Sequence, residues 1–359
     1  DFNNIRILVD PYLFGSAFNN GWNLLTEVDH TKNIDNITHI FYSHEHPDHF
    51  SIPFLKKIKP LVRKNITILY QHTYDKRIKN YCQKLGYKFK ELKDGFEESI
   101  SDNFSLIVGK VPFYDSWVNF KINDTNILNV NDCVLENPKL VLEINKKLNR
   151  KIDVLLTQFS YANFIEEDKQ ELRALKQLEK IKIQDEVLKP EYIVPFASFI
   201  YFSHQENKFM NENINSVNDT HKYLIKNCNA KPIILSPNEE WDLKDKNNDL
   251  SLCFWENIYK NIYNLNYNSL AKTYNAIDLI IESKRYIERL NKNNNLFLIK
   301  FLYYLNFFPS IKIHITDLNK YYHFDILRGL NQISVVNNTS SFVSFSSETL
   351  VFIFNYDYG

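Results

Sequence analysis

Six consecutive residues, His44-Glu45-His46-Pro47-Asp48-His49, contain three imidazoles and two carboxylates. They follow residues 37–42, an apolar, β-branched and aromatic run that predicts a buried strand. Side chains of these types are costly to bury together unless a metal ion or hydrogen bonds satisfy them. The sequence therefore predicts a metal site at the carboxyl end of this strand, and the alternative is an ordinary polar loop.

Apolar runs recur along the first two thirds of the chain and alternate with helical patterns. We expect strands at residues 5–9, 37–42, 66–70, 104–108, 117–122, 126–130, 152–157 and 192–194. From Glu166 onward we expect an amphipathic helix, with its inward stripe formed by Leu172, Leu175, Leu178 and Ile181. Strands that alternate with helices and end in polar residues favour either α/β architecture or a layered αββα arrangement.

The composition of the chain changes after residue 237. Residues 1–237 are expected to form the metal-binding domain, and the polar stretch 238–248 predicts a linker. Residues 258–305 predict helices, and residues 311–315, 332–336 and 350–354 predict strands. Residues 238–359 are therefore expected to form a smaller α+β region of unknown role.

The net charge and the cysteine content indicate which binding partners and which cellular compartment to expect. Lys and Arg total 43, as do Asp and Glu, so the zero net charge gives no field that favours nucleic acid or an anionic membrane. The four cysteines lack the paired spacing of a metal site, which indicates a reducing cytoplasm. Residues 296–308 are too short and too interrupted for a membrane span of about 20 residues. Because the only methionine is Met210, further residues are expected at both ends of the chain.

The spacing of the His-rich loop suggests two neighbouring metal positions. His44 and His46 can reach one position, whereas Asp48 and His49 can reach the other. Asp132 follows a later strand and can bridge the two. Neutral imidazole and carboxylate suit zinc and non-haem iron alike, so we expect one or two divalent ions of either metal.

Other loops supply further candidates. His204 can complete the second metal position, although an ordinary structural role is equally consistent with the sequence. Asp10, at the end of the first strand, is placed to orient a ligand or simply to cap a turn. Four aromatic residues on loops expected near the metal are candidate substrate contacts, or else cover for the core: Trp22, Phe159, Tyr161 and Phe196.

Val9-Asp10-Pro11, the His-rich loop and Asp132 together resemble the metallo-β-lactamase superfamily. In that superfamily an HxHxDH loop holds one or two metals between two β-sheets flanked by helices. Residues 10–22, 128–133 and 195–204 narrow the resemblance to the CMP-N-acetylneuraminate hydroxylase group. The resemblance implies a metallo-β-lactamase-like sandwich. Its implied ligands are His44 and His46 for the first metal, Asp48, His49 and His204 for the second, and Asp132 for both.

One departure from the superfamily pattern affects the first metal. A further histidine normally precedes the bridging aspartate, but residues 110–115 contain none, and Val111 stands about where it would fall. Asp115 is expected near the ligands, and either it or Tyr114 is the available substitute. We therefore expect a single tightly held metal, or iron in a carboxylate-rich site, rather than a symmetric pair.

Three functions remain open at this point. The resemblance implies an iron-dependent hydroxylase that acts on a sugar nucleotide or related sugar. The sialic acid hydroxylases receive electrons from an attached Rieske cluster, whose two cysteines and two histidines at close spacing this sequence lacks. A separate electron-transfer partner or a missing Rieske domain is therefore expected. One alternative is metal-dependent hydrolysis of a phosphodiester, lactone or amide, in which Asp48 or Asp132 is the catalytic residue that orients the metal-bound hydroxide. The other is a non-catalytic scaffold with a degenerate site.

Overall fold

The computed structural model describes the whole chain except residues 27, 29–33, 35, 113–114, 335–341 and 356–359. It divides into two compact units, Asp1–Tyr267 and Asn268–Gly359. The His-rich loop and Asp132 both lie in the first unit.

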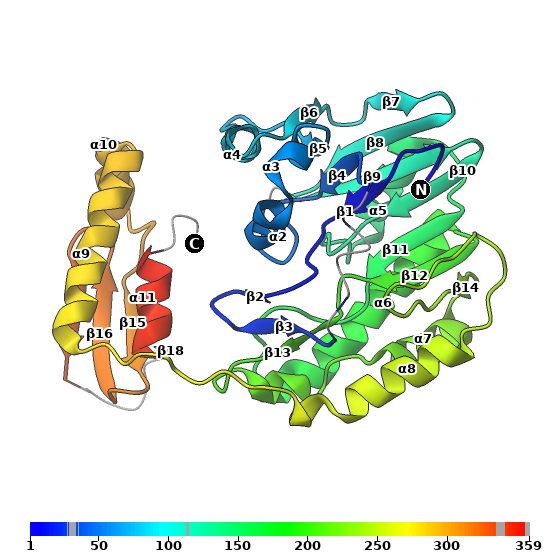
Figure 1. The fold of residues 1–359 in the computed structure, drawn as a ribbon. Helices are drawn as coiled ribbons and strands as arrows, with labels where there is room; N and C mark the ends of the chain where they lie inside the picture. The colour runs from blue at the N-terminus through cyan, green and yellow to red at the C-terminus, as the bar shows by residue number, and fades with distance from the viewer. Residues whose placement is uncertain (27, 29–33, 35, 113–114, 335–341, 356–359) are drawn as a thin grey trace. The chain divides into compact units, whose positions relative to one another are not determined.

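Two β-sheets that pack face to face form the centre of the first unit (Figure 1). The smaller sheet is parallel and has the order β1 (Ile7–Val9), β4 (His39–Tyr42), β5 (Thr67–Gln71) and β6 (Lys88–Leu92). The larger sheet has the order β14 (Lys231–Pro232), β12 (Tyr192–Phe196), β11 (Val154–Gln158), β10 (Thr125–Asn129), β9 (Ser116–Ile122), β8 (Phe104–Lys110) and β7 (Glu97–Ser101). Strands β10, β11, β12 and β14 are parallel, whereas β7, β8, β9 and β10 form antiparallel pairs.

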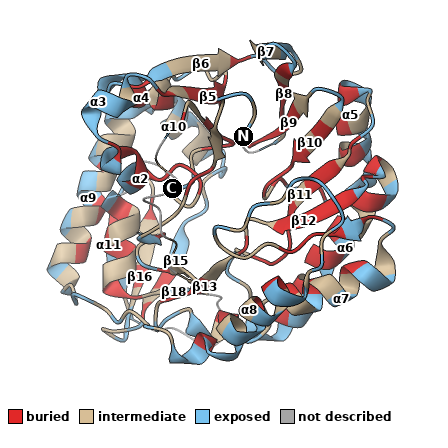
Figure 2. Ribbon diagram, turned by 45° about the vertical axis from the view of Figure 1, so that its right-hand side comes forward, coloured by how far each residue is buried: buried red, intermediate tan, exposed pale blue. Residues whose placement is uncertain are grey.

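Helices cover the outer faces of both sheets, and Figure 2 shows strands β10, β11 and β12 of the larger sheet coloured largely as buried, with α6 and α7 beside them. On the smaller sheet lie α2 (Ile52–Lys57) and α4 (Arg77–Lys84), which contribute Phe54 and Ile78 to the same hydrophobic cluster as Ile40. On the larger sheet lie α5 (Pro138–Leu148), α6 (Gln170–Leu188) and α7 (Val217–Asn227). The expected αββα sandwich is therefore confirmed.

Residues 238–267 belong to the first unit, although a boundary after residue 237 was expected. Glu239 accepts hydrogen bonds from the Ser236 N–H and from the Ser251 hydroxyl, and it pairs with Lys246 at 2.8 Å. Helix α8 (Asp249–Lys260) buries Trp255 in the core under the larger sheet. The polar composition of residues 238–248 thus reflects a hydrogen-bonded segment that fastens α8, not a linker between units.

The inward face of α6 differs from the expected leucine stripe. Leu178 and Ile181 are buried as expected, but Leu172 and Leu175 are exposed. The same buried face carries polar side chains at helical spacing, namely Gln170, Gln177, Lys180, Gln184 and Asp185. Two of the four residues expected to face inward therefore face solvent, and polar side chains occupy part of the helix face that packs against the sheet.

The second unit contains the sheet β17 (Gly329–Ile333), β16 (Lys320–Asp325), β15 (Ile311–Ile315) and β18 (Val343–Phe345), together with helices α9 (Ala276–Asn293), α10 (Leu296–Tyr304) and α11 (Ser347–Asn355). The strand expected at residues 350–354 is wrong, because these residues lie in α11. Their buried members, Leu350, Val351 and Phe354, follow helical spacing. The strand expected at residues 332–336 overlaps β17, and residues 335–336 lie outside the described residues.

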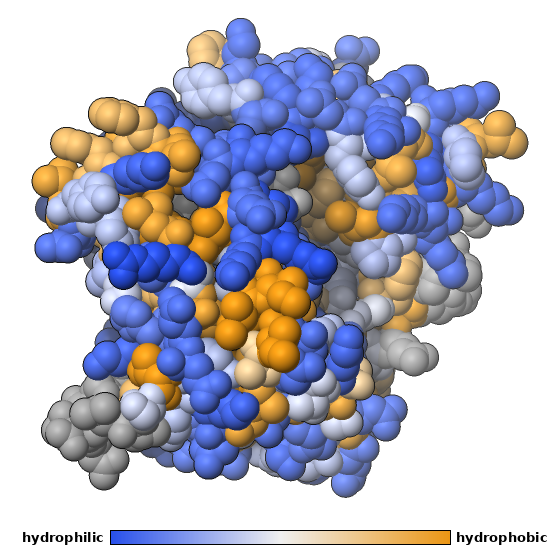
Figure 3. All heavy atoms as spheres, turned by 90° about the vertical axis from the view of Figure 1, so that its left-hand side faces the viewer, coloured by the Kyte–Doolittle hydropathy of each residue, from blue (hydrophilic) through white to orange (hydrophobic). Residues whose placement is uncertain are grey.

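Helix α10 carries apolar side chains and has no buried residue. Phe297, Phe301 and Tyr304 are exposed, and Figure 3 shows apolar patches on the face that is turned to the viewer. No helix among the described residues is long and apolar enough to cross a membrane.

Candidate metal centre

The centre is built where two adjacent parallel strands end. In the smaller sheet Val9 of β1 pairs with Phe41 of β4, so Asp10 and Ser43 emerge at the same edge. The Asp10 N–H donates to the Phe41 carbonyl at 2.9 Å, and Asp10 Oδ1 accepts from the Ser43 N–H at 2.7 Å. Asp10 has a φ of 43°, in the left-handed region. These bonds fix the Asp10 carboxylate at the base of the His-rich loop.

His49 lies between carboxylates on both sides of its buried ring. Its Nδ1 is 3.0 Å from Asp10 Oδ2. Its Nε2 is 3.4 Å from Asp48 Oδ2 and 3.5 Å from Asp132 Oδ2. A histidine that binds a metal commonly donates its other ring nitrogen to a carboxylate, which fixes the tautomer and the ring orientation. His49 has such a carboxylate, Asp10, beside its Nδ1, and its Nε2 faces Asp48 and Asp132.

His44 repeats the arrangement with a different carboxylate. Its Nδ1 is 3.3 Å from Asp115 Oδ1, and its Nε2 is 3.8 Å from Asp132 Oδ2. The ligand atoms of His44, His49 and Asp132 all lie within 4.8 Å of one another. Asp132 thus faces the Nε2 atoms of two histidines, each of which has a carboxylate beside its Nδ1.

Two carboxylate oxygens in the centre lack a protein partner. Asp48 Oδ1 and Asp132 Oδ1 are buried, and neither receives a hydrogen bond from the residues that the structure describes. A buried carboxylate oxygen without a donor is costly, and a cation supplies the missing interaction. The donor set of imidazole and carboxylate also suits zinc and iron. The residues present therefore fit a bound metal ion.

The charged groups of the centre also shift one another's pKa values strongly. Burial lowers the pKa of His49, but the carboxylates of Asp132, Asp48 and Asp10 outweigh it and raise that pKa well above its usual range. Burial raises the pKa of Asp132, but His49 and His44 outweigh it and lower that pKa. The pKa of Asp48 is raised, chiefly by burial. A metal ion held by His49 Nε2 and Asp132 would take the place of a proton on that ring nitrogen.

The other three expected ligands lie outside this compact group. His46 touches it through His44, since His46 Nδ1 is 2.8 Å from His44 Nε2. Asp48 touches it through His49. Within the described residues His204 is not a member of the group, and its backbone N–H donates to Asn207 Oδ1 at 3.0 Å.

A small sheet brings the loop of His204 to the loop that follows Asp10. Strand β13 (Ile200–Phe202) pairs with β3 (Trp22–Leu24), which pairs with β2 (Ser16–Ala17). The Ser203 N–H donates to the Gly21 carbonyl at 2.8 Å. His204 therefore lies beside the loop at residues 18–21, and Phe18 of that loop lies close to His46.

The aromatic candidates fall into two groups. Phe159 and Tyr161 are buried in hydrophobic clusters, and the Tyr161 hydroxyl donates to the Met210 carbonyl at 2.6 Å. They cover the core, which was the alternative interpretation. Trp22 and Phe196 are half-buried. Trp22 packs against Phe18, with ring centroids 4.5 Å apart.

Phe18 is an aromatic residue that the sequence analysis missed. Its ring centroid lies 6.2 Å from that of His46, and 39% of its surface is exposed. Its φ of 50° places it in a run of left-handed residues with Asn19 and Asn20. Its sequence signal was its place within residues 10–22, one of the segments that carry the family resemblance.

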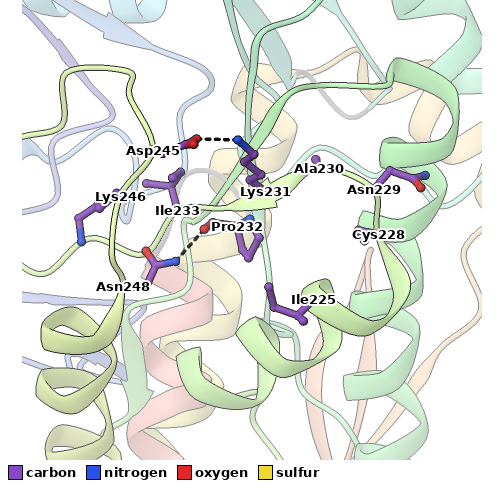
Figure 4. A pocket seen from close by; sticks show the side chains of 10 residues that line it. All are labelled: Ile225, Cys228, Asn229, Ala230, Lys231, Pro232, Ile233, Asp245, Lys246 and Asn248. Carbon is purple, nitrogen blue, oxygen red and sulfur yellow. Dashed lines mark hydrogen bonds and ion pairs between the residues drawn. The ribbon is translucent and has the colours of Figure 1, made fainter.

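A pocket of about 340 Å³ lies beside β14, among residues that take no part in the metal centre (Figure 4). Lys231 pairs with Asp245 across it at 2.7 Å, and the Asn248 amide donates to the Pro232 carbonyl at 2.8 Å. These contacts attach residues 245–248 to the edge of the larger sheet.

The αββα layers, with an HxHxDH loop at the carboxyl end of β4, have the arrangement of the metallo-β-lactamase fold. In sequence the chain is similar to cytidine monophosphate-N-acetylneuraminic acid hydroxylase from Xenopus laevis. The two are 26% identical over 231 residues, which cover 58% of this chain and 38% of that protein. It is also 26% identical over 236 residues to the human protein described as an inactive hydroxylase of the same name, covering 60% of this chain and 45% of that one.

Among solved structures, CmlA, a diiron β-hydroxylase from Streptomyces venezuelae, matches with a TM-score of 0.42 and 12% identity. The match covers 63% of this chain and 49% of that one. No protein-family profile matches the chain. The chain spans less than half the length of these curated relatives.

Proposed function

We propose that this chain is a metal-dependent enzyme of the metallo-β-lactamase fold that hydroxylates a sugar nucleotide or a related sugar. The observation that carries the metal-dependent part is the arrangement around Asp132. Two histidines turn their Nε2 atoms toward its Oδ2, while its Oδ1 lacks a donor among the described residues. Similarity to the CMP-N-acetylneuraminic acid hydroxylases supports the hydroxylase part.

The ligand assignment in this proposal has two positions that share Asp132. His44 and His46 serve the first, and Asp48 and His49 serve the second. His204 joins the second position through a change in its side-chain orientation, because its Nδ1 now accepts from the Glu206 N–H at 3.2 Å.

Neighbouring carboxylates fix the orientation and tautomer of the two histidine ligands His44 and His49. Asp10 and Asp115 accept the Nδ1 protons of His49 and His44, which turns both Nε2 atoms toward Asp132; a metal bound there would replace the contact between His44 Nε2 and His46 Nδ1. Ser43 reinforces this arrangement, because its hydroxyl lies 2.9 Å from His44 Nδ1. A bound metal would supply either a site for dioxygen chemistry, if it is iron, or a water whose pKa is lowered toward about 7.

The proposed reaction needs a substrate site near the metal and a source of electrons. In the proposal Trp22 and Phe196 contact the substrate, since both are half-buried. Electrons come from a separate electron-transfer protein or from a Rieske domain, which the sequence of this chain does not contain. The four free cysteines are consistent with a reducing, cytoplasmic setting.

Hydrolysis is the second candidate, and the environment of Asp48 favours it. Burial raises the pKa of this carboxyl group, and its Oδ1 has no hydrogen-bond donor in the described structure. Such a carboxyl is suited to orient a water molecule and to accept its proton. A phosphodiester, lactone or amide would be the substrate.

One pair of assays separates the candidates. Protein loaded with Fe²⁺ is supplied with CMP-N-acetylneuraminic acid, dioxygen and a ferredoxin reducing system, and product mass and oxygen uptake are measured. The hydroxylase proposal expects a product heavier by one oxygen atom, together with oxygen consumption. Turnover of a chromogenic phosphodiester by the Zn²⁺ form, without that product, would instead support the hydrolase. No bound metal, and full function in His46→Ala, would support a scaffold.

A further inference from the structure

Lys180 is a buried lysine on the face of α6 that packs against the larger sheet. Only 4% of its surface is exposed. Its Nζ lies 3.4 Å from Oε1 of Gln158, the last residue of β11. The same oxygen accepts a hydrogen bond from Gln177 Nε2 at 2.5 Å. Lys180 and Gln177 are one turn apart on the helix, so they converge on one acceptor.

This ammonium group is incompletely satisfied by its neighbours. Lysine has three N–H donors, but in the described structure Lys180 has one acceptor and no carboxylate within 4.0 Å. A buried charge is costly unless negative charge nearby balances it. The group therefore depends on carboxylates that lie farther away than an ion pair.

The contact with Gln158 places Lys180 close to the metal centre, because the Gln158 N–H donates to the carbonyl of Asn131, the residue before Asp132, at 2.9 Å. Burial lowers the pKa of Lys180 to about 8, and Asp132 opposes this more than any other charged group. Cys133 and Glu136 act in the same direction as Asp132, whereas Arg173 acts against it. Arg173 is itself paired with Glu136 at 2.7 Å, which leaves Asp132 as the main balancing charge.

The metal centre in turn carries an excess of carboxylates. Asp10, Asp48, Asp115 and Asp132 surround only three imidazoles, and the ammonium group of Lys180 offsets part of this excess. Charges in a protein interior act over distances longer than a hydrogen bond, because water does not screen them there. A fixed cation near Asp132 must therefore weaken the attraction of the centre for any further cation.

We propose that Lys180 is a positioning residue for the metal centre: it holds Gln158 at the exit of β11, and its charge limits how tightly the Asp132 side binds a metal ion. This inference rests on the proposed metal-dependent function. It concerns metal affinity and requires no particular substrate or reaction.

The test measures the dissociation constant for Zn²⁺ by competition with a chromophoric chelator. Lys180→Gln removes the charge and keeps a hydrogen-bonding group, and Lys180→Met removes both. Both variants should bind Zn²⁺ about tenfold more tightly than the wild type, because a buried repulsion is lost. Lys180→Arg retains the charge and should match the wild type. Lys176→Gln removes a charge from the exposed face of the same helix and should change the affinity less than about twofold.

A residue needed only for packing would not tighten metal binding when replaced. Unchanged or weaker Zn²⁺ binding in both Lys180→Gln and Lys180→Met would overturn the inference, as would loss of folding in both. If the wild type binds no Zn²⁺ and no Fe²⁺, the proposed metal-dependent function fails as well. Tight binding by the wild type with no change in the variants rejects the role of Lys180 alone.

Discussion

Asp10 Oδ2 lies 3.0 Å from His49 Nδ1, a contact between the exit of β1 and the far end of the His-rich loop. The other oxygen of the same carboxylate accepts from the Ser43 N–H. One buried side chain thus anchors the loop at its start and orients the histidine at its end. This explains why the loop can present His49 Nε2 toward Asp132.

Replacement of Asp10 by Asn should weaken metal binding while leaving the fold intact. The amide keeps the shape of the side chain but no longer stabilises the metal-binding tautomer of His49. We expect a loss of about 10- to 100-fold in Zn²⁺ affinity, measured by chelator competition. Asp102→Asn, on an exposed turn, is the matched control and should leave the affinity unchanged. Equal affinities for Asp10→Asn and wild type would show that this contact does not orient a ligand.

Glu239 should contribute stability that depends on pH. Burial alone would raise its pKa, but hydrogen bonds from Lys246, the Ser236 N–H and Ser251 lower it to about 2. Because the folded-state pKa is lower than the unfolded one, the contribution is present above about pH 4.5 and is lost as the pH falls toward 2. Glu239→Gln should therefore be less stable than wild type by about 1–3 kcal/mol at pH 7.

Urea unfolding at a series of pH values checks this prediction. The difference in unfolding free energy between Glu239→Gln and wild type should shrink steadily between pH 4.5 and pH 2. A difference that stays constant over that range would mean that the carboxylate charge is not what fastens residues 236–251.

Gly109 should be required for the packing of the larger sheet. It lies opposite Trp117 in the pairing of β8 with β9, and a Cβ atom at this position would lie 2.0 Å from Trp117 Cζ2. Trp117 is fully buried, so its indole has little room to move. Gly109→Ala should lower the free energy of unfolding by about 1–3 kcal/mol.

Thermal unfolding of two variants tests this explanation. The double variant Gly109→Ala/Trp117→Phe should lose less stability than the sum of its single changes, because the smaller ring removes the clash. Strict additivity of the two single changes would argue against a direct clash between the two side chains.

The apolar strands that alternate with helices predicted α/β or layered αββα architecture, and the family resemblance singled out the sandwich. The region around residues 350–354 shows the limit of that reasoning. A short apolar run with β-branched and aromatic residues fits a strand, yet Leu350, Val351 and Phe354 also share one face of a helix, and tertiary packing selected the helix. Local pattern alone cannot decide between these outcomes.

The candidate site was predictable where its residues are contiguous and not where they depend on packing. His44 and His49 come from one loop after β4 of the smaller sheet. Asp132 follows β10 of the larger sheet, so it was expected from the family resemblance and meets the two histidines because the sheets pack face to face. Lys180 and Phe18 left no such signal. A lysine in a helix is usually exposed, and only the fold reveals that this one is buried near Asp132.

Metal analysis of the purified protein beside Asp132→Asn tests the central claim most directly. Asp132 is the carboxylate that faces both His44 and His49, so its charge is needed for tight binding. By inductively coupled plasma mass spectrometry, the wild type should carry iron or zinc at one to two ions per chain, and Asp132→Asn should lose most of it. A wild-type protein without bound metal, or a variant that keeps its full metal content, would contradict the account.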